Sequence, residues 1–132
     1  MKTSSARAGV ALLLCAGIAS SAHAQKDTRP PTTPQMVSAS AVSSSQIDLT
    51  WLASTDNVGV VEYLVERCEG AGCTNFALLA SAPAMPSGGT YSDKSLNAST
   101  SYTYRVRARD AANNRSLPSS SATAVTLASD CT

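Results

Sequence analysis

Residues 101–110 read Ser-Tyr-Thr-Tyr-Arg-Val-Arg-Ala-Arg-Asp. Apolar or aromatic side chains alternate with polar ones along this stretch. One side of it carries Tyr102, Tyr104, Val106 and Ala108. Alternation of this kind is typical of a strand with one face in the core and the other in water. The stretch therefore predicts a half-buried antiparallel strand with these four side chains in the core.

Six further segments have the length of a strand. They lie at residues 36–42, 46–51, 60–67, 76–80, 90–92 and 122–127. Turn-forming Asp, Asn, Gly and Pro residues separate them, at 56–59, 70–72, 83–89 and 113–114. No stretch among them has a helical period. Short strands at this regular spacing predict an all-β, seven-stranded antiparallel β-sandwich.

The second and third segments also indicate which face is buried. Ile47, Leu49 and Trp51 share one face of the second segment, which predicts a core position for Trp51. The alternative is an exposed tryptophan on which a sugar stacks. In the third segment the same rule turns three side chains inward: Val61, Tyr63 and Val65. It leaves Leu64 as a single outward apolar residue.

Residues 1–24 have the pattern of a secretory signal peptide. Basic residues begin it, a short apolar run follows, and small residues precede a predicted cleavage between Ala24 and Gln25. The run is far shorter than the ~20 residues that span a bilayer, so we expect no membrane insertion after cleavage. The alternative, a lipid-modified Cys15, conflicts with the leucine before it, because lipoprotein signals need a small residue there. We therefore expect a secreted or periplasmic protein.

Cleavage would leave one domain between two short segments. Residues 25–34 form a proline-rich lead-in, residues 35–128 the folded domain, and residues 129–132 a C-terminal tail. The whole chain has 10 basic and 9 acidic residues, and loss of Lys2 and Arg7 with the signal peptide leaves it close to neutral. Nucleic acids and anionic membranes bind clustered, unpaired positive charge, so we expect neither as a partner.

Catalysis is not expected. The only histidine, His23, lies inside the signal peptide. The mature chain therefore has no Ser-His-Asp or Cys-His machinery, no histidine base and no histidine metal ligand. We predict that the protein is not an enzyme and has no catalytic residue, no cofactor and no metal site, apart from one calcium alternative described below.

Several motifs resemble a known family. Leu96 lies six residues before Tyr102, which suggests a tyrosine corner, where the phenol hydroxyl bonds to nearby backbone. The other matching residues are Pro31, Pro34, Trp51, 54–60, 63–67, Thr100, Val106, Ala108 and 110–113. Over residues 30–127 the chain resembles a fibronectin type III domain of the kind found in secreted bacterial proteins, often beside carbohydrate-active enzymes.

This resemblance implies an immunoglobulin-like sandwich. The first, second and fifth strands would form one sheet, and the third, fourth, sixth and seventh strands the other. The resemblance implies no catalytic residue. Residues 110–115 contain no Arg-Gly-Asp tripeptide, so integrin-type adhesion is not implied.

Cys68 and Cys73 flank the residues Glu-Gly-Ala-Gly. In an oxidising compartment, two cysteines across a glycine-containing turn predict a disulfide. A metal site is the alternative, but it would need two more soft ligands, and only Cys131 and carboxylates remain. Cys131 is then free, paired with another chain, or a sign that the natural protein continues beyond Thr132.

A basic stripe formed by Arg105, Arg107 and Arg109 lies on the polar side of the opening stretch. One interpretation is a site for anions or sulfated polysaccharides. The other is a set of cross-strand ion pairs with Glu62 and Glu66, which share the solvent face if the third and sixth strands are neighbours. The ion-pair interpretation is favoured because the negative charges of the glutamates neutralise much of the positive charge of the stripe.

Five oxygen-bearing side chains are expected in loops at one end of the sandwich. They are Asp56, Asn57, Asp110, Asn113 and Asn114. Their oxygens are of the type that calcium prefers. Asx turns, in which Asp or Asn bonds to backbone two residues on, explain the same residues more simply. The ligand spacing of a dedicated calcium loop is missing, so turns are favoured.

The sequence therefore predicts a secreted, non-catalytic module that acts as a spacer or protein-interaction unit. A rigid sandwich would hold loops at its two ends, and loops carry recognition in such folds. The alternative is a carbohydrate-binding or cell-surface adhesion module accessory to a polysaccharide-active enzyme. The expected partner is accordingly a protein or polysaccharide at the cell surface.

Overall fold

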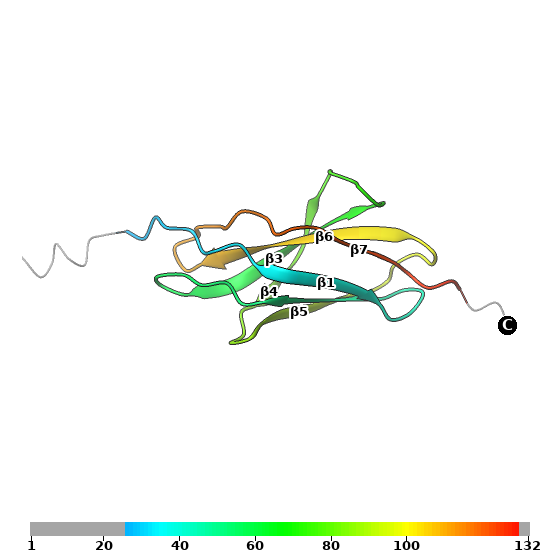
Figure 1. Cartoon of the computed structure of the whole chain (residues 1–132), viewed down its shortest axis with the longest axis horizontal. Coiled ribbons are helices and arrows are strands. Elements are labelled where there is room, and N and C mark those ends of the chain that lie inside the picture. Colours follow the sequence, from blue (N-terminus) through cyan, green and yellow to red (C-terminus); the bar gives the residue numbers. More distant parts are fainter. Residues whose placement is uncertain (1–25, 130–132) are drawn as a thin grey trace, which may run out of the picture.

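Two antiparallel sheets packed face to face make up the computed structural model, which describes residues 26–129 (Figure 1). The strands are β1 (Gln35–Ala41), β2 (Ile47–Leu52), β3 (Val60–Glu69), β4 (Ala77–Pro83), β5 (Gly88–Asp93), β6 (Ser101–Asp110) and β7 (Ala122–Val125). One sheet has the order β1-β2-β5 and the other β4-β3-β6-β7. The predicted seven-stranded sandwich is confirmed, with the strands divided between the sheets as the resemblance implied.

Three predicted features lie outside the described residues: the signal peptide, its cleavage point and Cys131. Within residues 26–129, no helix is long and apolar enough to span a membrane.

The inward face of β6 is the centre of the core. Tyr104, Val106 and Ala108 have no exposed surface, and Tyr102 is 3% exposed. Trp51 of β2 is also 3% exposed and contacts Tyr63 of β3 edge to face, with ring centroids 5.4 Å apart. Burying a large apolar side chain contributes roughly 1.5–3 kcal/mol, so this row of the opening stretch is a main source of stability.

Strict alternation predicted the burial of two β3 side chains wrongly. The register between β3 and β6 shifts between Val60 and Glu62, so Val61 is an extra residue in a bulge and is 44% exposed. Leu64 has outward parity but is only 5% exposed. It lies on a central strand opposite Arg107, and the aliphatic stems of arginines cover apolar surface on such faces.

The first residues of β5 were predicted to be a turn. Gly88 and Gly89 instead pair with Leu52 and Trp51 of β2. A Cβ atom on Gly89 would lie 2.5 Å from carbon atoms of the Trp51 indole, and one on Gly88 would lie 1.9 Å from the Trp51 carbonyl oxygen. Two glycines are therefore needed where β5 passes the tryptophan.

A polar network joins the two sheets. Asp93 at the end of β5 is 2% exposed and accepts hydrogen bonds from Arg67 Nη1 at 2.9 and 3.1 Å. The Tyr104 hydroxyl donates to the same carboxylate at 2.7 Å. Burial disfavours the charged form of Arg67 and by itself would lower its pKa. The hydrogen bond to Asp93 and the negative charge of Asp93 outweigh this effect of burial, so the pKa of Arg67 is raised. Burial, followed by the bond to Asp93, raises the pKa of Tyr104.

Candidate functional site

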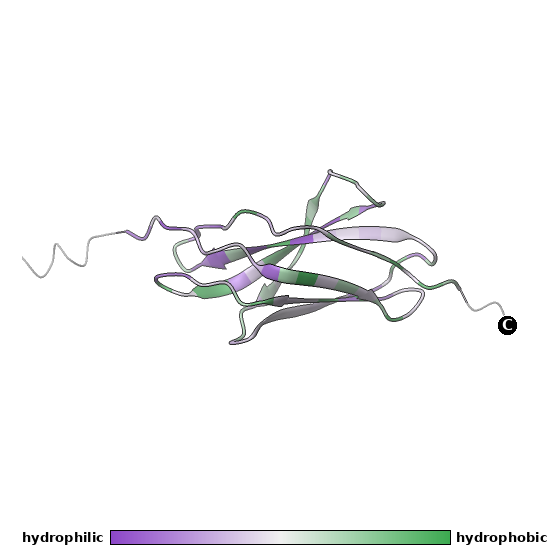
Figure 2. Ribbon diagram, in the orientation of Figure 1, coloured by the Kyte–Doolittle hydropathy of each residue, from purple (hydrophilic) through white to green (hydrophobic). Residues whose placement is uncertain are grey.

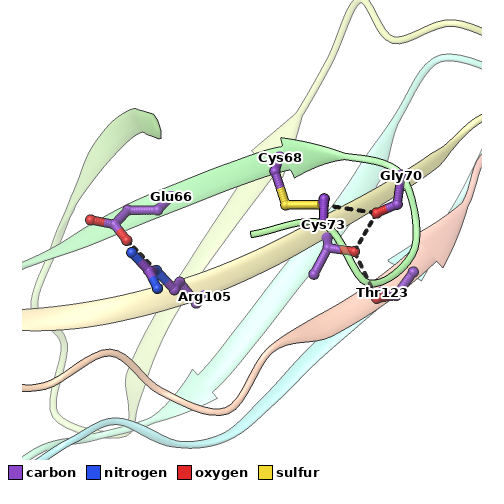
Figure 3. The surroundings of a disulfide bond; sticks show 7 residues. Glu66, Cys68, Gly70, Cys73, Arg105 and Thr123 are labelled. Carbon is purple, nitrogen blue, oxygen red and sulfur yellow. Dashed lines mark hydrogen bonds and ion pairs between the residues drawn. A yellow bond between two sulfur atoms is a disulfide. The ribbon is translucent and has the colours of Figure 1, made fainter. Parts of the chain in front are cut away.

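Cys68 and Cys73 are joined by a disulfide across the turn that follows β3 (Figure 3). Their Cα atoms are 6.1 Å apart, and Gly70 and Gly72 between them have φ values of 111° and 72°, a region that favours glycine. Closing so short a loop stabilises the fold by about 2 kcal/mol. Because the disulfide uses both thiols, the alternative of a metal bound by this pair is wrong. The turn is tied to β6 by the Thr103 hydroxyl, which donates to the Gly70 carbonyl at 2.7 Å.

The basic stripe is paired with acids on β3. Arg105 forms an ion pair with Glu66 (Figure 3), and Arg107 Nε lies 3.3 Å from the other oxygen of the same carboxylate. Arg109 Nε donates to Glu62 Oε2 at 2.7 Å. Each of the three arginines lies beside an acid, as the ion-pair interpretation predicts, but Arg105 and Arg107 share Glu66. The three arginines and two glutamates therefore keep a net charge of +1, much less than the clustered positive charge that a sulfated polysaccharide needs.

Trp51 cannot stack against a sugar, because it is 3% exposed in the core. Tyr63, Tyr102 and Tyr104 are equally buried. Phe76 is partly buried and lies beneath the Arg105 guanidinium, with the Cζ atom 4.2 Å from its ring centroid. Tyr91 is partly buried and packs against the core. The aromatic residues of the described chain therefore do not form the exposed row that glycan stacking uses.

Tyr102 makes a backbone hydrogen bond at the corner that precedes β6. Its hydroxyl oxygen accepts the N–H of Asn97 at 3.1 Å. Leu96, the residue expected beside it, is partly buried and packs against the core. The bond holds the loop against the strand that it enters.

Three carboxylates meet at the end of the sandwich where the lead-in arrives. Asp56 follows β2, Asp110 ends β6 and Asp27 belongs to the lead-in, and one oxygen of each lies within 4.8 Å of the others. Figure 2 shows hydrophilic residues in the lead-in and at this end of the sandwich. Sequence reasoning placed Asp56 and Asp110 at the same end but missed Asp27, since a polar, proline-rich segment carries no signal of where it packs.

Asx turns use part of this cluster, as the favoured interpretation predicts. Asp56 Oδ2 accepts two backbone N–H groups at 3.0 and 3.1 Å, and Asp110 Oδ1 accepts two at 2.8 and 3.0 Å. Burial favours protonation of Asp110, but side-chain and backbone hydrogen bonds from Asn114 outweigh it and lower the pKa of Asp110. Asp110 is therefore a carboxylate at neutral pH.

Comparisons with known proteins agree with this architecture. The family model described as "Fibronectin type III domain" matches residues 32–125. The chain is 37% identical over 102 residues to an alpha-amylase of Niallia circulans, covering 77% of this chain and 7% of the amylase. It is 38% identical over 111 residues to chitinase A1 of the same organism, covering 84% of this chain and 14% of the chitinase.

Among solved structures, chitinase ChiA74 from Bacillus thuringiensis matches with a TM-score of 0.58 and 35% identity. The match covers 78% of this chain and 14% of the chitinase. In each of these three enzymes the chain therefore corresponds to a small part of the whole protein.

Proposed function

The chain belongs to the fibronectin type III family, and from that premise we propose that it is a secreted, non-catalytic module acting as a spacer or protein-interaction unit. The matched relatives are named as an amylase and chitinases, and the chain spans between 7% and 14% of their length. A part of that size suits an accessory role rather than a catalytic one. The disulfide between Cys68 and Cys73 supports an oxidising compartment, outside the cell or in the periplasm.

The observation that carries the spacer proposal is the position of the two ends of the sandwich. The lead-in leaves one end of the long axis and the segment after β7 leaves the other (Figure 1). Between them lie two sheets with a continuous apolar core. A rigid body whose chain enters and leaves at opposite ends holds attached segments apart, and its end loops remain available for a protein partner.

A carbohydrate-binding module is the second candidate. The names of the relatives favour it, since they describe enzymes that act on starch and chitin. The burial of Trp51, Tyr63, Tyr102 and Tyr104 speaks against it, because these rings cannot reach a glycan. The spacer is therefore the better supported function.

Binding to insoluble polysaccharides separates the two candidates. The purified secreted protein is mixed with chitin, microcrystalline cellulose or starch granules, and the protein left in the supernatant is measured at increasing polysaccharide concentration. We expect no more depletion than for an unrelated protein of similar size and charge. Saturable depletion by any one polysaccharide would replace the spacer proposal with the carbohydrate-binding one.

A further inference from the structure

Two carboxylate oxygens at the lead-in end of the sandwich have no partner. Asp27 Oδ2 and Asp56 Oδ1 each expose less than 1 Å² to solvent, and neither accepts a hydrogen bond. The third acid of the cluster, Asp110, has no exposed surface. Asx turns explain one oxygen of Asp56 and one of Asp110, but they do not explain the buried, unbonded oxygens. A carboxylate oxygen withdrawn from water without a partner is costly.

Side-chain cations do not supply the missing partner. The four ion pairs found within residues 26–129 use Asp93, Glu66 and Glu62 as their acids, and none includes a carboxylate of this cluster. Three carboxylates whose oxygens lie within 4.8 Å of one another repel unless a proton or a metal cation lies between them. A hydrogen bond between the side chains of Asp27 and Asp110 can relieve part of this repulsion, but it leaves Asp56 Oδ1 without a partner.

We propose that Asp27, Asp56 and Asp110 bind a calcium ion. The donors are all carboxylate oxygens, the ligand type that calcium prefers, and no cysteine or histidine is among them. Two oxygens bound to one calcium lie at most about 5 Å apart, twice the usual Ca–O distance, so oxygens within 4.8 Å of one another can share the ion. This proposed site differs from the sequence-based expectation that the chain binds no metal. It does not depend on the proposal that the chain acts as a spacer.

The ion would connect three segments that are far apart in the chain. Asp27 is already held loosely, because Asn57 Nδ2 donates to its Oδ1 at 3.3 Å and Asn114 Nδ2 donates to its carbonyl at 3.1 Å. Calcium would add a charged link from the lead-in to the loop after β2 and to the end of β6. It would therefore stiffen the joint at which the chain enters the sandwich.

The test is calcium binding by the purified secreted chain, measured by isothermal titration calorimetry and by Tm in EDTA and in 10 mM CaCl2. Extracellular calcium modules bind with Kd values of about 10⁻⁴ to 10⁻³ M, so we expect a Tm rise of roughly 5–15 °C. Asp27→Asn lies outside the strands and leaves the sandwich intact. We expect this variant to raise the Kd by about tenfold or more, because fewer charged ligands remain.

Glu69→Gln is the matched control, since it removes the same charge from an exposed residue at the far end of β3. It should bind calcium as the unmodified chain does. Absence of a Tm shift and of binding heat in 10 mM CaCl2 would overturn the proposal. An Asp27→Asn variant that binds as tightly as the Glu69→Gln control would overturn it too, as would an equal Tm shift with MgCl2 at the same ionic strength.

Discussion

Replacing Gly88 with alanine is expected to lower the free energy of unfolding by about 3–5 kcal/mol, much of the stability of a domain of this size. The new Cβ would lie 1.9 Å from the carbonyl oxygen of Trp51 and 2.9 Å from its carbonyl carbon. Both are backbone atoms of the paired strand, so β5 would have to separate from β2. The φ of 136° at this position adds strain for any residue with a side chain.

Gly59→Ala is the control for this substitution. Gly59 has a similar φ of 129°, but a Cβ atom added there would meet no heavy atom within 4 Å. Its replacement should therefore cost only the backbone strain, about 1–2 kcal/mol. Urea denaturation of both variants measures the difference. Equal losses of stability would contradict the pairing of Gly88 with Leu52 on which the two-sheet arrangement rests.

Asp93→Ala is expected to cost about 3 kcal/mol, because it removes a buried carboxylate that accepts hydrogen bonds from two side chains of the other sheet. The Tyr104 hydroxyl would lose its acceptor, and the Arg67 guanidinium would lose both of its hydrogen bonds to the carboxylate. The Arg67 side chain is 32% exposed and can partly rehydrate, which places the cost at the lower end of the range for buried pairs.

The comparison for Asp93→Ala is Glu62→Ala, which removes the ion pair with Arg109. Those two side chains are 26% and 27% exposed, and pairs near the surface contribute about 0–1 kcal/mol. The midpoints and slopes of urea unfolding at neutral pH give both free energies. If Asp93→Ala were no more destabilising than Glu62→Ala, the link between the sheets would be unimportant for stability.

Local pattern was enough to predict the fold, because each central strand has one apolar face. The alternation of residues 101–110 identified the buried face of β6, and Trp51 was placed correctly by its parity with Ile47 and Leu49. The same alternation predicted the burial of Val61 and Leu64 wrongly, because tertiary structure decides the burial of both side chains. A bulge adds a residue to β3, and a central strand position buries a side chain that parity turns outward.

The polar contacts between distant segments could not be predicted in this way. Asp93 lies on one sheet and its partners Arg67 and Tyr104 on the other, and nothing near Asp93 in the sequence indicates how the sheets face each other. Asp27 lies in a segment without hydrophobic periodicity, so its approach to Asp110 depends on the finished fold. The candidate calcium site forms only when these three chain segments come together in the folded chain, so the complete set of three aspartates could not be predicted from the sequence.

The most direct test of the central claim, that the chain is a non-catalytic module, is the release of soluble reducing sugar. The purified protein is incubated with chitin, cellulose and starch, with an active chitinase and an active amylase as positive controls, in EDTA and in 10 mM CaCl2. We predict no release above the buffer blank on any of the three polysaccharides. Release that rises in proportion to the concentration of the protein would contradict this account.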